Sequence, residues 1–140
     1  MRADFYHLTR VPLEKALPSI AERILANGER LVIVAEDEKL LTRIDALLWS
    51  YKPESFLPHG REGDQPILLT ADVEGSPAQN IALIDGVWRD SALDFARAFY
   101  FFDSQSIDGA RGAWRGLAKR SEVERHYWKQ DAAGKWVEGP

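Results

Sequence analysis

The sequence predicts an α/β fold with a largely parallel central sheet and helices on both of its faces. Short apolar runs typical of buried strands alternate with longer segments whose apolar residues recur at helical spacing. This alternation favours parallel pairing, because each helix returns the chain to the end of the sheet where the preceding strand began. A chain of 140 residues is long enough to bury one core, so we expect a single domain over residues 1–140.

The first part of the chain predicts two strand–helix pairs. Residues 3–8 are expected to form a strand, and residues 13–26 a helix, because apolar side chains recur there at helical spacing. Residues 31–35 (LVIVA) form a continuous apolar run, as in strands that are covered on both faces. A second helix is expected to open on the acidic segment 36–38, since carboxylates favour the positive end of a helix dipole. Pro53 should prevent this helix from continuing.

The middle of the chain predicts a long loop and two short strands. Residues 51–66 contain three prolines and two glycines, and a loop of this length in a compact domain is often functional. The apolar runs at residues 67–70 and 80–84 are typical of buried strands. The segment 74–77, Glu-Gly-Ser-Pro, supplies a turn between them.

The last third predicts two helices, one strand and a tail. Ser91 is expected to cap a helix that reaches residue 96, and the aromatic run 99–102 to form the next strand. Residues 108–119 are expected to be helical, although two glycines weaken the intrinsic propensity. Residues 126–137 are expected to form either a terminal hairpin or a loosely held strand.

Composition excludes several kinds of site. The chain contains no cysteine, which rules out disulfides, thiolate metal sites and cysteine nucleophiles and favours a cytoplasmic location. Nowhere do eighteen uncharged apolar residues follow one another, so we expect no membrane span.

The charge is unevenly distributed. The net charge of −4 argues against a protein whose whole surface grips nucleic acid. The stretch 110–129, however, carries six Lys and Arg residues against two glutamates. Such a stretch is either a solvated helix face or the binding site of a localised anionic partner.

The sequence contains no convincing active site. Neither of the first two expected strands runs into a G-x-G-x-x-G or G-x-x-x-x-G-K-[ST] loop, so a phosphate cradle is not predicted. His7, His59 and His126 lie in separate segments without metal-ligand spacing. Asp45 and Asp85 could in principle pair as catalytic acids, but single acids within a helix or after a strand are far more often solvated or capping. We expect no catalytic residue, no metal and no cofactor.

The segment 36–59 has a distinctive sequence, EDEKLLTRIDALLWSYKPESFLPH. An E-D-E-K helix start leads to L-W and then to E-S-F-x-P-H, and in this the segment resembles the chi subunit family of bacterial DNA polymerase III. Further similarity comes from Phe5-Tyr6, from residues 93–96 and 110–115, and from the tail at 127–136.

The resemblance implies a Rossmann-like α/β domain without a nucleotide-binding loop. It also implies a non-catalytic accessory subunit of a DNA-directed DNA polymerase complex, monomeric by itself and in contact with DNA mainly indirectly. In this family one surface binds the acidic C-terminal tail of single-stranded-DNA-binding protein. Another surface binds the psi subunit, which connects to the clamp loader.

Position by position, the resemblance places the tail site on three aromatic and two basic residues: Trp49, Phe56, Arg111, Trp114 and Arg115. The tail ends in a phenylalanine with a free carboxylate, so Trp49 and Phe56 would form the wall for the ring. Arginine suits the carboxylate because its planar fork makes two parallel hydrogen bonds. Lys119 and Arg120 would extend the positive patch and speed encounter. Without the resemblance, Trp49 reads as core, Phe56 as a loop anchor and the arginines as a solvated face.

Two other functions remain open, as does the place of the psi interface. Arg111, Trp114, Arg115 and Trp128 together would suit direct binding of single-stranded nucleic acid. A nucleotide-dependent enzyme on a Rossmann-like sheet would need a phosphate cradle. The aromatic run 99–102 is expected to be mostly core, with Phe99 as the one candidate for contact with psi.

Overall fold

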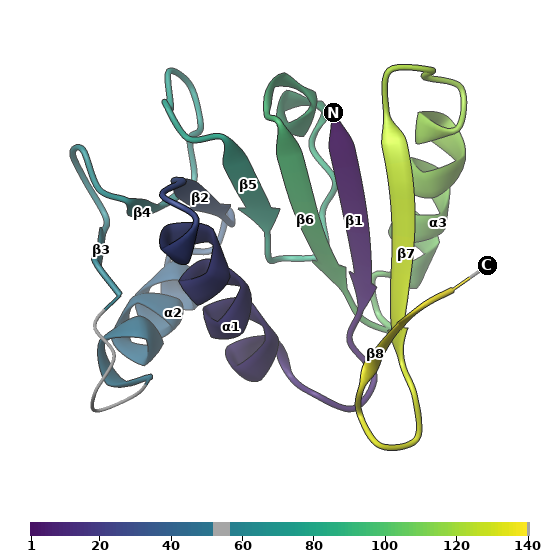
Figure 1. The fold of residues 1–140 in the computed structure, drawn as a ribbon, viewed down its shortest axis with the longest axis horizontal. Coiled ribbons are helices and arrows are strands. Elements are labelled where there is room, and N and C mark those ends of the chain that lie inside the picture. Colours follow the sequence, from purple (N-terminus) through teal and green to yellow (C-terminus); the bar gives the residue numbers. More distant parts are fainter. Residues whose placement is uncertain (52–56, 140) are drawn as a thin grey trace.

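The sheet has eight strands in the order β3-β4-β2-β5-β6-β1-β7-β8 (Figure 1). The computed structural model describes residues 1–51 and 57–139. The strands are β1 (Arg2–His7), β2 (Leu31–Val34), β3 (His59–Gly60), β4 (Ile67–Thr70), β5 (Asn80–Leu83), β6 (Arg97–Phe102), β7 (Glu124–Gln130) and β8 (Trp136–Glu138). Every pairing is parallel except that of β8, which runs antiparallel to β7. The α/β prediction with a largely parallel sheet is confirmed.

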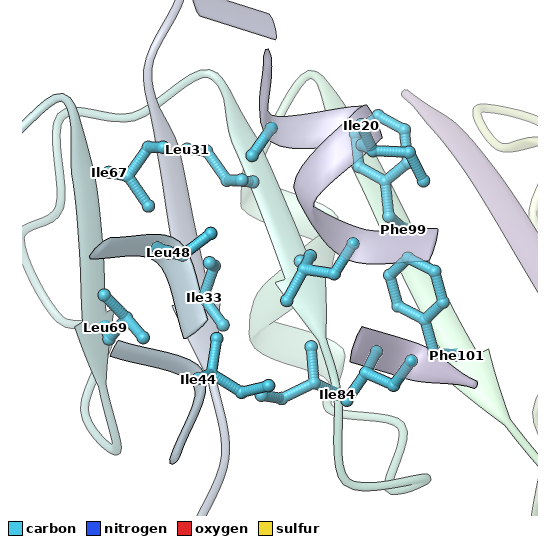
Figure 2. Close-up of a cluster of buried hydrophobic side chains, with 14 of the residues drawn as sticks. Ile20, Leu31, Ile33, Ile44, Leu48, Ile67, Leu69, Ile84, Phe99 and Phe101 are labelled. Carbon is cyan, nitrogen blue, oxygen red and sulfur yellow. The ribbon is translucent and has the colours of Figure 1, made fainter. Parts of the chain in front are cut away.

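Helices α1 (Leu13–Ala26) and α2 (Glu38–Ser50) cover one face of the sheet, which we call the front face (Figure 1). Figure 2 shows their apolar stripes meeting alternate strand residues, for example Ile44 and Leu48 of α2 near Ile33 and Leu69. The helices form here because their apolar residues recur at helical spacing, and Asp37 caps α2 by accepting a hydrogen bond from the Lys39 N–H at 2.9 Å.

Helix α3 (Ile107–Leu117) and the short 3-10 helix η1 (Asp90–Asp94) cover the opposite face, which we call the back face. Ala110 and Leu117 of α3 and Ala92 of η1 are buried there against Phe5 and Tyr100. Strands β2 and β5 are buried on both faces, as expected for the apolar run LVIV of β2 and for the residues IAL that follow Asn80 in β5. Helices therefore lie on both faces, as predicted.

Several details differ from the sequence prediction. The helix expected from Ser91 is a five-residue 3-10 helix preceded by Arg89, because Phe95 is already extended (φ −100°, ψ 159°) and leads into β6. Strand β6 begins at Arg97, two residues earlier than expected. The long loop contains the two-residue strand β3, which pairs with β4. The predicted stop at Pro53 lies outside the described residues.

The tail forms a terminal hairpin rather than a loosely held strand. Strand β7 pairs with β1 along Arg2–Tyr6, and β8 folds back onto β7 through a turn in which Gly134 adopts a φ of 82°. In the part of the chain that the structure describes, no helix is long and apolar enough to cross a membrane.

Candidate partner-binding site

A pocket of about 240 Å³ opens between α3 and the back face of the sheet. We call it the α3 slot, and its lining comes from α3, β1, β6 and β7: Phe5, Phe102, Ile107, Ala110, Arg111, Trp114, Arg115 and Tyr127. Its lining combines four aromatic rings with two guanidinium groups. That combination suits a ligand with one apolar group beside a negative charge.

The helical spacing of α3 places these side chains. Ala110 and Leu117 are buried against the sheet, and Trp114, between them in sequence, is partly buried at the slot. Arg111 and Arg115 are exposed, one turn apart, as predicted. Arg111 pairs with the carboxylate of Asp108 at 3.9 Å, and Asp108 is almost fully exposed, so this ion pair holds the guanidinium weakly.

The aromatic rings hold one another in edge-to-face contacts. The Phe5 centroid lies 5.2 Å from that of Trp114 at 77° between planes, and 4.9 Å from that of Tyr100 at 84°. Tyr127 packs at 6.1 Å and 72° against Trp114. Since Phe5 is 1% exposed, the slot rests directly on the core.

The electrostatic influence of Arg111 reaches two groups beside the slot. Burial lowers the pKa of His7, and the positive charge of Arg111 lowers it further while Asp103 opposes the change. Burial raises the pKa of Tyr127, with Arg111 acting in the opposite direction. His7 Nδ1 lies 3.0 Å from the Tyr127 hydroxyl, which links the two groups.

Two site residues were missed by sequence reasoning, Tyr127 and Arg125. Tyr127 lines the slot, and the Arg125 guanidinium lies 4.2 Å from the centre of the Trp114 ring. In a strand, residues two apart point to the same face, so the sequence could have shown that Arg125 and Tyr127 lie on one face of β7. To place that face beside α3, one must also know that β7 pairs with β1, and no local sequence pattern predicts this pairing.

Trp49 does not lie at this slot. It belongs to α2 on the front face, whereas α3 lies on the back face, so the prediction of one cleft containing Trp49 and Arg111 is wrong. Its side chain is 60% exposed, and its ring lies 4.7 Å from that of the buried His59. Phe56, the other predicted wall residue, lies outside the described residues.

The basic residues that follow the slot remain on the protein surface. Lys119 and Arg120 are exposed just beyond the end of α3, and Arg120 is 3.4 Å from Glu122. They can attract an anionic ligand without lining the slot. Whether they and the slot residues bind a partner stays a prediction.

The four residues that would together suit single-stranded nucleic acid do not form one surface. Trp128 lies on the front face, where its ring stacks on Tyr6 and its Nε1–H donates to Asp4 at 2.8 Å. It is therefore separated by the sheet from Arg111, Trp114 and Arg115. Phe99 is only 3% exposed, so a psi contact through its side chain has little surface to use.

A second cavity, of about 620 Å³, lies at the carboxyl ends of β1, β5 and β6, the usual place for ligands in open α/β sheets. The loop after β1 is already engaged there: the backbone N–H groups of Thr9, Arg10 and Val11 all donate to Gln130 Oε1, at 2.9–3.2 Å. Those donors are thus not free for a phosphate. No group of three or more His, Asp and Glu side chains among the described residues is arranged to hold a metal.

Comparison with known proteins gives two similarities. Residues 1–123 match the model of a family described as DNA polymerase III chi subunit, HolC. The chain is also 35% identical over 92 residues to DNA polymerase III subunit chi of Escherichia coli (strain K12). That match covers 62% of this chain and 61% of the relative, so it spans less than two thirds of the relative's length. Strands β7 and β8 lie beyond the residues that match the family model.

Proposed function

The chain belongs to the DNA polymerase III chi subunit family, and from this premise we propose that it is a non-catalytic accessory subunit whose α3 slot binds the acidic C-terminal tail of single-stranded-DNA-binding protein. The observation that carries the proposal is the pairing of an aromatic pocket with two exposed guanidinium groups, of which Arg111 has only a weak ion pair, to Asp108 at 3.9 Å.

The chemistry of the tail fits this slot. The tail ends in a phenylalanine with a free carboxylate, and the rings of Phe5, Trp114 and Tyr127 provide apolar and edge-on contacts for its side chain. Arg111 and Arg115 each offer a planar fork for the carboxylate. Acidic residues preceding the phenylalanine would meet the field of Lys119 and Arg120, which speeds association more than it deepens affinity.

The second partner, psi or another clamp-loader component, would bind on the front face of the sheet, opposite the α3 slot. Trp49 is one of two large hydrophobic residues that are mostly exposed in the described chain, and exposed tryptophans are favoured at binding hot spots. We assign it to contact with psi or another clamp-loader component. Because the two faces are separated by the sheet, one subunit can hold the tail and the clamp loader together in the cytoplasm.

Titration with an acidic peptide ending in phenylalanine tests the proposal. The wild-type protein is expected to bind in the micromolar range or more tightly, and Arg111→Ala to lose about 1.5–3 kcal/mol, which is tenfold or more. Arg43→Ala is the matched control, because it removes the same charge from α2 on the front face.

Unchanged affinity in Arg111→Ala would place the tail elsewhere. A pulldown with full-length and tail-deleted single-stranded-DNA-binding protein tests the partner itself. Capture should be lost on deletion of the tail, whereas steep salt-dependent binding of bare oligonucleotide would favour direct nucleic-acid binding instead.

A further inference from the structure

Strand β7 supplies one side of the α3 slot, although it lies beyond the residues that match the family model. In the parallel register Arg125 is opposite Ala3 and Tyr127 is opposite Phe5. Alternation along the strand turns both side chains toward the back face, where α3 packs. The slot is therefore built jointly by a helix within the family match and a strand outside it.

Arg125 holds Trp114 at two points. Its guanidinium carbon lies 4.2 Å from the centre of the Trp114 ring, and its Nη1–H donates to the Trp114 carbonyl oxygen at 2.8 Å. The first contact is a cation–π interaction that restricts the plane of the ring. The second ties the last turns of α3 to the sheet, at the helix end where a cation is favoured. One side chain thus fixes both the ring and the backbone that carries it.

Tyr127 forms the neighbouring wall and is itself held in place. Its ring lies 6.1 Å from that of Trp114 and 6.2 Å from that of Phe102, and its hydroxyl is 3.0 Å from His7 Nδ1. Both walls of the slot are therefore positioned before a ligand arrives. A preorganised wall discriminates by shape, because little ordering free energy is spent when the right side chain enters.

We propose that β7 determines the preference of the slot for an aromatic terminal residue, with Arg125 as the positioning residue for Trp114 and Tyr127 as the second wall. This inference rests on the proposed function, since it assumes a peptide terminus in the α3 slot. It differs from a purely electrostatic role for Arg125, which would attract every acidic peptide equally.

A cycle of two peptides and three proteins separates these roles. The peptides share one acidic sequence and end in phenylalanine or alanine. The proteins are the wild type, Arg125→Gln and Arg120→Gln, where the control removes the same charge from an exposed arginine beyond the end of α3. Affinities are measured by calorimetric titration at one fixed ionic strength.

Arg125→Gln is expected to reduce the preference for the phenylalanine peptide by about three- to tenfold, the range of a cation–π contact. Arg120→Gln should leave the preference unchanged and weaken both peptides by the same small factor. If Arg125→Gln also weakens both peptides equally, Arg125 acts only as a charge and the inference is overturned.

Tyr127→Leu keeps the test decisive if Arg125→Gln does not fold. It retains apolar volume and removes the ring and its hydroxyl contact, so it should reduce the same preference. An unchanged preference in a folded Tyr127→Leu protein would overturn the inference. A wild-type protein that binds neither peptide would instead overturn the proposed function.

Discussion

Two tryptophans on opposite faces of the sheet have very different surroundings. Trp114 packs between the Phe5 and Tyr127 rings, with Arg125 over its face, in a pocket that Arg111 also lines. Trp49 is 60% exposed at the end of α2. Both are large aromatic residues on amphipathic helices, yet only the first combines a rigid wall with a cationic rim. Residue type alone therefore did not distinguish the two positions, because the difference lies in what surrounds each ring.

The largest expected difference between the two regions is in folding stability, because the slot rests on the core and Trp49 does not. Phe5→Ala should lower the free energy of unfolding by about 3–5 kcal/mol, because it removes a fully buried ring beneath Trp114. Trp49→Ala, at an exposed position, should change it by less than about 1 kcal/mol. Chemical denaturation of the two variants measures the difference. Equal losses would mean that Trp49 is as integrated into the core as the slot.

Tail binding should distinguish the two tryptophans directly. Trp114→Ala is expected to cost at least about 2 kcal/mol of binding free energy, the level of a hot-spot residue. Trp49→Ala should leave tail affinity within about twofold, because it lies across the sheet. Calorimetric titration of both variants with the same peptide is the measurement. A large loss in Trp49→Ala would contradict the separation of the two sites.

His59 lies next to Trp49, and its substitution tests whether the two faces of the sheet are coupled. Its Nδ1 lies 2.5 Å from the Leu57 carbonyl oxygen and its Nε2 3.1 Å from that of Asp45, so it links β3 to α2 beneath the tryptophan ring. His59→Ala should destabilise the fold by about 1–3 kcal/mol, since buried polar groups lose their partners. Tail affinity of the folded variant should be unchanged. Weakened tail binding would reveal coupling between the faces.

The smallest expected effect concerns the hairpin that carries Arg125. Hydrogen bonds with Glu124 and then with Glu138 raise the pKa of His126, and its Nδ1 is 2.6 Å from Glu138 on β8. A raised folded-state pKa means that the stabilisation is present below the unfolded-state pKa and is lost as the pH rises through the folded one.

Amide exchange of β8 should therefore become faster, relative to the intrinsic rate, as the pH rises from below 6.5, the ordinary pKa of histidine, through the raised folded-state pKa of His126. The free energy involved should be about 0.2–1 kcal/mol, because both glutamate partners of His126 are exposed to solvent. His126→Gln is the control and should remove the pH dependence. An identical profile in that variant would assign the effect to other groups.

The local elements were predicted well because their signals are local. The helix expected at residues 13–26 has those same bounds, since its apolar spacing and the Asn27-Gly28 stop act within a few residues. The apolar run at 67–70 is likewise a strand. The 3-10 helix η1 and the two-residue strand β3 were missed because both are shorter than any periodic pattern can reveal.

The candidate site was predicted in part. Arg111, Trp114 and Arg115 do share one face of a helix, which follows from their spacing. The position of Trp49 relative to them was wrong, because an amphipathic pattern shows that a helix has a buried side but not which face of the sheet receives it. The roles of these residues in binding remain predictions.

By itself the sequence determined which of the longer segments are helices and strands, and the alternation that makes the sheet mostly parallel. Only the tertiary structure decided that α2 and α3 cover opposite faces, and that residues 125 and 127 stand beside residues 3 and 5. The reason is physical: backbone periodicity acts over a few residues, whereas strand order depends on burial and hydrogen bonding summed over the whole chain. The aromatic and cationic side chains were readable one by one, but their meeting in a single slot depended on that strand order.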